Sequence, residues 1–120
     1  MLIYIAGQMR GIPQYNIHAF NEAEAYIKST GHDAINPCKL DIDSGIDIYN
    51  ESPHKVWSTD HLRDIVIRDI SELVKCDAIY MLEGWEKSIG ASAEYSIARW
   101  LGIKIIHAQD RILLEYDLHK

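Results

Sequence analysis

Short apolar runs alternate with segments of helical periodicity along the chain. Leu2–Ala6 is an apolar run that ends at a glycine, and runs at 32–36, 77–82 and 103–107 follow it, the first of these being the weakest. Short apolar runs bounded by turn signals are typical of strands buried on both faces of a parallel sheet. The pattern therefore predicts four strands, and Pro37 is expected to stop the second.

Apolar positions at helical spacing fill the intervals between these strands. The first helix is predicted to follow Asn16, a candidate N-cap, and to end before Gly31. One face of this helix is predicted to consist of Ile17, Phe20, Ala23, Glu24 and Ile27, with Glu24 at its edge. Further helices are predicted from Ser58 to about residue 75, over 90–101 and, as a last short helix, over 110–118.

Residues 38–57 show no clean period and are rich in acidic side chains. A connection of this length inside a compact domain is usually functional, often a lid, or carries a short helix of its own. Both interpretations are open from the sequence.

The order of elements predicts one domain over 1–120, an α/β fold with a doubly wound parallel sheet. We expect four to five strands in a flavodoxin-like or Rossmann-like arrangement with helices on both faces, because right-handed crossovers alternate in that way. Ligands of such sheets bind beyond the carboxyl ends of the strands. The segments expected to face the site are 7–13, 37–57, 83–90 and 107–110.

Composition narrows the class of protein. The 120 residues carry a net charge of −6, which argues against binding to duplex nucleic acid, because phosphate neutralisation needs a basic surface. No apolar run is long enough for a membrane span, and no secretory signal precedes the first strand, so a cytoplasmic protein is expected. Cys38 and Cys76 fit no metal or redox spacing, the histidines are scattered, and we expect no metal or other cofactor.

Two carboxylates are candidates for chemistry. Glu94 is expected in the first turn of its helix, where the helix dipole favours the ionised form that a nucleophile needs; it can equally serve only to complement the dipole. Asp69 interrupts a seam formed by Leu62, Val66 and Leu73. Facing inward it would have a raised pKa suited to a proton donor, whereas a small rotation of the helix would leave it at the rim.

Other side chains allow a binding role beside a structural one. Ser88 and Gly90 precede a helix, and their backbone amides can meet an anion or simply form a cap. Arg10 lies between two glycines, where it can bind phosphate or stay solvated. Tyr4 lies inside the first strand, where its hydroxyl needs a partner if it is buried, and filling the core is the alternative role. Among the tryptophans, Trp57 and Trp85 are candidates to stack on a base, and Trp100 is expected to pack in the core.

Three segments taken together resemble the nucleoside 2-deoxyribosyltransferase-like superfamily, over roughly residues 2–107. They are Tyr4-Ile5-Ala6-Gly7-Gln8-Met9-Arg10-Gly11, Asp69-Ile70-Ser71-Glu72-Leu73-Val74-Lys75-Cys76-Asp77 and Ser88-Ile89-Gly90-Ala91-Ser92-Ala93-Glu94. The phrase at 82–91 also looks like a compact branch common in bacteria and their phages, many of whose members have no assigned function.

The resemblance implies an enzyme that cleaves or exchanges the N-glycosidic bond of a (deoxy)nucleoside or its 5′-monophosphate without a cofactor. Glu94 would be the nucleophile and Asp69 would help to protonate the leaving base, with Tyr4 orienting Glu94. The residues implied to bind substrate are Gly7, Arg10, Gly11, Ser88 and Gly90. The opening loop resembles the deoxynucleoside 5′-monophosphate hydrolases of the superfamily, although these carry serine where this chain has Gln8.

Relatives in the superfamily also complete their site with a residue from a neighbouring subunit, which implies a homodimer or homotetramer. The alternative to an enzyme is a module of the same fold that binds a nucleotide without chemistry. A structural or regulatory protein would instead show a large exposed apolar patch and no pocket at the strand ends.

Overall fold

A computed structural model describes residues 1–111 as one four-stranded sheet flanked by helices. The elements in chain order are β1 (Leu2–Ala6), the 3₁₀ turn η1 (Pro13–Asn16), α1 (Ile17–Ser29), β2 (Asp33–Ile35), α2 (Pro37–Asp43), α3 (Thr59–Leu73), β3 (Ala78–Met81), η2 (Trp85–Lys87), α4 (Ile89–Leu101), β4 (Lys104–His107) and η3 (Ala108–Asp110). The last helix expected at 110–118 falls almost entirely outside the described residues.

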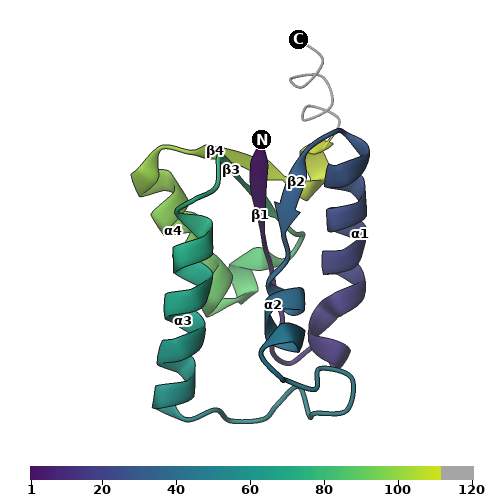
Figure 1. Cartoon of the computed structure of the whole chain (residues 1–120), viewed down its shortest axis with the longest axis vertical. Coiled ribbons are helices and arrows are strands. Elements are labelled where there is room, and N and C mark those ends of the chain that lie inside the picture. The colour runs from purple at the N-terminus through teal and green to yellow at the C-terminus, as the bar shows by residue number, and fades with distance from the viewer. Residues whose placement is uncertain (112–120) are drawn as a thin grey trace.

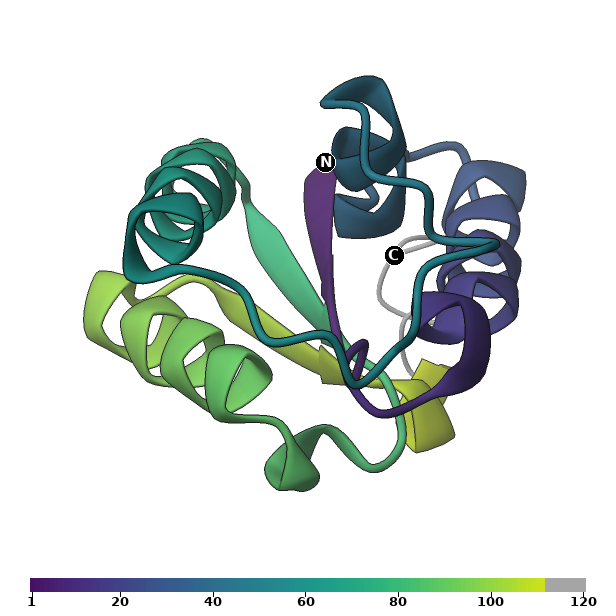
Figure 2. The ribbon, with the colours of Figure 1, turned by 90° about the horizontal axis from the view of Figure 1, so that it is seen from below.

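All strand pairs of the sheet are parallel, and their order is β2-β1-β3-β4. Helices α1 and α2 lie on one side of the sheet and α3 and α4 on the other (Figures 1 and 2). This is the doubly wound α/β arrangement with helices on both faces that the sequence predicts, with four strands. It places the carboxyl ends of the strands at one edge, together with the loops that follow them.

Alternation along β1 divides its side chains between two cores. Ile3 and Ile5 pack with Phe20 and the rest of α1, whereas Tyr4 and Ala6 point into the second core beneath α3 and α4. All four side chains are buried. Successive residues of a strand face opposite sides of the sheet, so a continuous apolar run is what a doubly covered strand needs.

Helix α1 has the predicted face: its buried residues are the five of that face, and Glu24, expected at the edge, is 7% exposed. Asn16 is its N-cap residue, as expected, but does not cap it through its side chain. Its backbone adopts a φ of 63°, and its side-chain amide instead donates to the carbonyl of Gln8 at 3.0 Å. This bond ties the start of α1 to the loop after β1.

The acidic connection after β2 begins with a short helix of its own. Pro37 does end the strand, as predicted, but it also occupies the first turn of α2, where its missing N–H costs nothing. Asn36 caps this helix, because its side-chain oxygen accepts from the amide of Cys38 at 3.0 Å. Of the two interpretations of 38–57, a short internal helix is therefore correct for its first part.

Two packing expectations are wrong. Trp100 is 90% exposed rather than in the core, because it lies on the outer side of α4. Of the predicted apolar seam of α3, only Leu73 is buried, and Val66 is 55% exposed. The amino-terminal turns of α3 face a pocket instead of a closed core, so apolar periodicity there does not mean burial. Among the helices of residues 1–111, none has the length and apolar character needed to cross a membrane.

Candidate functional site

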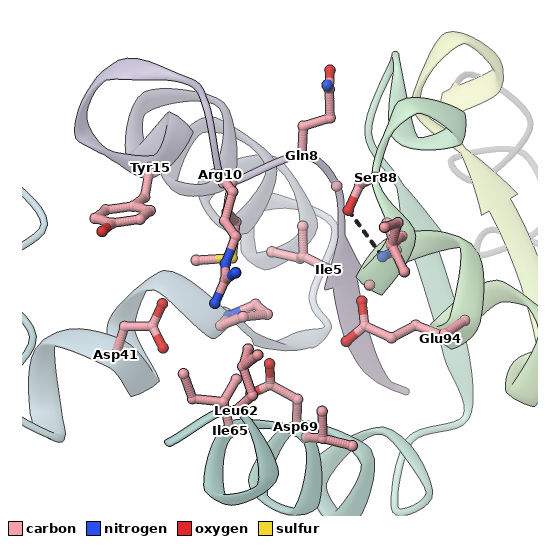
Figure 3. Close-up of a pocket in the computed structure, with 18 of the residues that line it drawn as sticks. Ile5, Gln8, Arg10, Tyr15, Asp41, Leu62, Ile65, Asp69, Ser88 and Glu94 are labelled. Atoms are coloured by element: carbon pink, nitrogen blue, oxygen red, sulfur yellow. Dashed lines mark hydrogen bonds between the residues drawn. The ribbon is translucent and has the colours of Figure 1, made fainter. Parts of the chain in front are cut away.

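A pocket of about 520 Å³ opens at the carboxyl ends of the strands, within the size range of small-molecule sites. It lies between the loop after β1, helices α2 and α3, and the start of α4 (Figure 3). The polar and charged side chains that line it are Gln8, Arg10, Tyr15, Asp41, Trp57, Asp69, Lys87, Ser88 and Glu94. Both candidate carboxylates, Asp69 and Glu94, therefore face one pocket, Asp69 from α3 and Glu94 from α4.

A hydrogen bond from Tyr4 holds the Glu94 carboxyl. The Tyr4 hydroxyl donates a hydrogen bond to Oε2 of Glu94, and the tyrosine ring is fully buried in the second core. Burial and the nearby negative charges of Glu94 and Asp69 raise the pKa of Tyr4 well above its usual value, so it stays a neutral donor. Tyr4 therefore fills the core, and Glu94 is the partner of its buried hydroxyl.

The electrostatics of Glu94 differ from the sequence expectation. Helix α4 begins at Ile89, which puts Glu94 in the second turn rather than the first, where the field of the helix terminus has already fallen off. Burial raises the pKa of Glu94 to about 8, and the bond from Tyr4 opposes this rise only in part. In the ligand-free protein the carboxyl is therefore mainly protonated at neutral pH.

Asp69 lies on the pocket wall, with 16% of its side chain exposed. Arg68 donates to its Oδ1 from Nε at 3.0 Å and from Nη2 at 2.8 Å. Burial raises the pKa of Asp69 to about 6, although the charge of Arg68 and its hydrogen bonds pull in the opposite direction. Of the two interpretations of Asp69, the inward-facing one describes this position, and the surface it faces is a pocket.

Arg68 connects Asp69 to a second buried carboxylate. Its Nη2 also donates to Oδ1 of Asp41 at 2.6 Å, and the Asp41 side chain is only 3% exposed. One guanidinium thus clamps the acidic segment of α2 to α3. Burial raises the pKa of Asp41, and Arg68 counteracts this shift.

The start of α4 has the geometry of an anion or hydroxyl site. Ser88 is the N-cap, since its Oγ accepts from the amide of Ala91 at 3.1 Å, and its own hydroxyl proton is free to point elsewhere. The amides of Ile89 and Gly90 have no hydrogen-bond partner within residues 1–111, as expected for the first positions of a helix. Ser88, Ile89 and Gly90 all line the pocket.

The two glycines of the first loop have different roles. Gly7 lines the pocket at the end of β1, where a Cβ atom would lie 2.7 Å from Cδ1 of Leu82, so no larger residue fits. Gly11 is not among the lining residues, and its binding role stays a prediction. Its backbone has a φ of 79°, and its amide donates to the carbonyl of Pro53 at 2.9 Å, which fastens the loop to the acidic connection.

Arg10 lies on the face of Trp57, with its guanidinium carbon 4.2 Å from the ring centroid. Tyr15 borders the same tryptophan, at 6.0 Å between ring centroids, and all three residues line the pocket. Of the tryptophans proposed to stack on a base, Trp57 is thus at the pocket. Trp85 packs against Tyr95 and lies outside the lining.

Comparison with known proteins identifies the family but not the activity. The family described as "Domain of unknown function (DUF4406)" matches residues 1–107. The chain belongs to this family. No curated protein matches the sequence. Within residues 1–111 of this DUF4406 member, no group of three His, Cys, Asp or Glu side chains is placed to hold a metal ion.

The sequence did not single out Arg68 and Asp41. Arg68 precedes Asp69 in the chain, so a pairing of these neighbours is visible as an adjacent opposite charge. The bond to Asp41 spans 27 positions and depends on how α2 and α3 are placed on either side of the pocket, which no local pattern encodes.

Proposed function

We propose that this protein cleaves or exchanges the N-glycosidic bond of a (deoxy)nucleoside or its 5′-monophosphate through a glycosyl ester on Glu94. The observation that carries the proposal is that Glu94, bound by Tyr4, and Asp69, bound by Arg68, face one pocket of nucleoside size. The resemblance of the three sequence segments to the nucleoside 2-deoxyribosyltransferase-like superfamily supports the same chemistry.

In the first half-reaction, a carboxylate oxygen of Glu94 attacks C1′ of the sugar. The bond from C1′ to the base nitrogen breaks, its electron pair passes to the base, and protonated Asp69 supplies the proton that neutralises the leaving group. The products are a free base and a glycosyl ester on Glu94. Such a double displacement places one carboxyl as nucleophile and another as acid, as in retaining glycosidases.

In the second half-reaction, water or another base attacks C1′ from the face that the first base left. The ester bond to Glu94 breaks and restores its carboxylate, while Asp69, now ionised, accepts the proton that the nucleophile releases. Two inversions give net retention at C1′. Tyr4 keeps one oxygen of Glu94 engaged, so that the other is directed at the sugar.

The pKa values of the pair define its working range. With the pKa of Asp69 at about 6 and that of Glu94 at about 8, the two carboxyls together hold one proton between these pH values. The reaction needs this proton on Asp69. Burial raises the pKa of Glu94 more than that of Asp69, so the shared proton of the free protein lies mainly on Glu94. Positive charge developing at C1′ favours the ionised form of Glu94 and thus draws the pair into the reactive state.

The remainder of the substrate binds on either side of these carboxyls. A sugar hydroxyl or a 5′-phosphate is expected at Ser88 and the two free amides of Ile89 and Gly90, where the helix terminus favours negative charge. Arg10 keeps its outer N–H groups available while its face covers Trp57, so it can contribute a second contact to an anionic substrate.

A second copy of the chain is proposed as the partner. Large apolar side chains are exposed on the paired helices α3 and α4 and at the C-cap of α3: Val66, Ile67, Val74, Ile89, Trp100 and Leu101. Ile67 and Val74 are seven residues apart, and Ile89 and Trp100 eleven, so each pair shares one face of its helix. Val66 and Ile89 also line the pocket, so a copy packed on this face would close the pocket rim.

Base release tests the proposed reaction. The protein is incubated with deoxynucleosides and their 5′-monophosphates, with and without a second free base, and products are separated by chromatography. Free base without an acceptor indicates a hydrolase, whereas a new nucleoside formed only with an acceptor indicates a transferase. Glu94→Gln should abolish either product, and Glu83→Gln, at an exposed carboxyl outside the pocket, should not.

Mass spectrometry identifies the carboxyl that forms the ester. A 2′-fluoro-arabinosyl nucleoside is a suitable probe, because the electron-withdrawing fluorine slows hydrolysis of the intermediate. A sugar mass on the peptide that contains Glu94 supports the assignment, and the same mass on the Asp69 peptide contradicts it. Binding of these nucleotides with no turnover by the wild-type protein would favour the non-catalytic nucleotide-binding module.

A further inference from the structure

Asp41 lies across the pocket from the start of α4. It is on the last turn of α2, is 2% exposed and lines the pocket. In Figure 3, Asp41 and Glu94 are on opposite sides, with Asp69 on α3 between them. A molecule whose sugar is at Glu94 therefore points its far end toward Asp41.

One oxygen of this carboxylate is committed and the other is not. Oδ1 accepts the 2.6 Å bond from Arg68, which fixes the orientation of the group. Oδ2 has no hydrogen-bond partner within residues 1–111. An ionised carboxylate only accepts hydrogen bonds, so the group that meets Oδ2 in the pocket must be a donor. Oδ2 is not among the buried side-chain atoms that lack a partner, so it is reachable from the pocket, and a ligand can supply this donor there.

The surroundings of Asp41 suit a flat heteroaromatic ring. Trp57, covered by Arg10, and Tyr15 line the pocket, and Figure 3 shows Arg10 and Tyr15 on the same side as Asp41. Aromatic and guanidinium faces stack on nucleobases with little regard to their identity. The identity of the base must then be read at its edge, by a group such as Asp41.

We propose that Asp41 is a specificity-determining residue that accepts a hydrogen bond from the exocyclic amino group of the substrate's base. The substrates are then nucleosides or 5′-monophosphates of adenine or cytosine in preference to those of hypoxanthine or uracil. The amino group projects from the base edge, away from the glycosidic bond, which matches the position of Asp41 across the pocket from Glu94. The proposal rests on the proposed function, because that function places the sugar at Glu94.

In hypoxanthine or uracil a keto oxygen replaces the amino group. Its lone pair would face the Asp41 carboxylate, and two acceptors form no hydrogen bond. Sites that hydrogen-bond a substrate donor discriminate strongly against analogues without it, since a buried polar group is then left unpaired. We expect the kcat/KM of base release to favour deoxycytidine over deoxyuridine, and deoxyadenosine over deoxyinosine, by about tenfold or more.

The test compares these two pairs, as nucleosides and as 5′-monophosphates, in the wild-type protein and two variants. Asp41→Asn keeps the size of the side chain and an oxygen for Arg68 but presents an N–H₂ group to the pocket. It should lower kcat/KM at least tenfold on the amino substrates and bring each ratio to one or below. Asp43→Asn, at an exposed carboxylate on the same helix, should leave both ratios unchanged.

Equal rates within each pair, a preference for the keto members, or an equal loss on all four substrates in Asp41→Asn would overturn the proposal. If Asp41→Asn does not fold, as judged by circular dichroism, the wild-type ratios decide alone. If no base is released from any substrate, calorimetric binding of the same compounds replaces the rates. An amino preference in binding that Asp41→Asn removes supports the role of Asp41 even though the proposed reaction fails, and its absence rejects that role.

Discussion

The Tyr4 hydroxyl donates a hydrogen bond to the carboxyl of Glu94, which joins the central strand to the second turn of α4. The two residues are 90 positions apart in the chain. The tyrosine is rigidly packed, so its hydroxyl fixes the carboxyl orientation without a flexible link. The bond also stabilises the ionised form of Glu94 and so lowers the pKa that burial has raised.

The proposed release of base is expected to follow a bell-shaped pH profile with limbs near pH 6 and pH 8. Below pH 6 both Asp69 and Glu94 are protonated, and above pH 8 both are ionised, so the state with one shared proton dominates between these limits. The profile of kcat/KM for base release, measured from pH 4 to pH 10, checks this. A single limb would show that only one of the two carboxyls titrates in the essential range.

Tyr4→Phe should slow base release and move one limb of this profile. Loss of the hydrogen bond raises the pKa of Glu94, so the descending limb moves above pH 8 while the ascending limb stays in place. We expect kcat/KM at the optimum to fall about 10- to 100-fold, because the free energy of a hydrogen bond to a charged group corresponds to a rate ratio of that size. An unchanged descending limb with reduced activity would instead indicate a purely structural role for Tyr4.

Arg68→Gln should destabilise the fold and also shift the ascending limb of the pH profile of base release. The variant leaves the buried Asp41 carboxylate without its cation, at a cost of about 3–5 kcal/mol in the free energy of unfolding. It also removes the charge that lowers the pKa of Asp69, so the ascending limb should move above pH 6. Arg63→Gln is the matched control on the same helix, because the ion pair of Arg63 within residues 1–111 is with the exposed Asp60. Its effect on the free energy of unfolding should be under about 0.5 kcal/mol.

Glu94→Gln should stabilise the protein at alkaline pH. The folded pKa of Glu94, about 8, exceeds its ordinary value of 4.5, so the folded state binds more protons than the unfolded state between these two pH values. The stability contributed by the neutral carboxyl is complete below pH 4.5 and decreases as pH rises through 8. A neutral amide does not suffer this loss.

Thermal unfolding at pH 4 and pH 9 measures the effect of Glu94→Gln. The melting temperature of the variant should exceed that of the wild type at pH 9, and the difference between the two should shrink at pH 4. In a domain of this size, a change of about 1 kcal/mol in the free energy of unfolding shifts the melting temperature by about 4 °C. Glu83→Gln should show no such widening, because Glu83 is exposed. A gap that does not depend on pH would argue against a raised pKa of Glu94.

Gly7→Ala and Gly90→Ala should differ in stability although both glycines line the pocket. A Cβ atom at Gly7 would lie within 3.0 Å of three side-chain atoms of Leu82, so overpacking should cost about 1–3 kcal/mol. A Cβ at Gly90 meets only Ser88 Oγ at 3.9 Å, and alanine favours the helix, so stability should stay unchanged or rise by up to about 1 kcal/mol. Urea unfolding of both variants provides the comparison.

Trp100→Glu should abolish self-association. The wild-type protein is expected to sediment as a dimer or a higher oligomer in analytical ultracentrifugation, and the variant as a monomer, because a charge at a position that is 90% exposed in the single chain disrupts only an interface. Tyr49→Glu, at a residue 55% exposed between α2 and α3, should retain the wild-type association. A wild-type monomer at all concentrations would reject the second copy as partner.

The sequence by itself determined the strands, the main helices and the places where candidate chemistry could lie. Leu2–Ala6 and the core face of α1 follow from local periodicity, and the caps Ser58 and Ser88 follow from residue type, because these signals depend on neighbours a few positions away. The topology then placed the segments that follow the strands at one edge of the sheet. Glu94 and Asp69 could be selected on this basis as candidate site residues, but their protonation states could not be assigned.

Only the tertiary structure decided how these groups meet. The bond from Tyr4 to Glu94, and the clamp of Arg68 on Asp41, join elements far apart in the chain. The protonation of Glu94 is governed by its desolvation in the assembled pocket, which outweighs the field of the helix terminus that the sequence suggested. Likewise, an apolar position such as Trp100 belongs to a core or to a surface depending on which layer covers it, and residue identity alone does not contain that information.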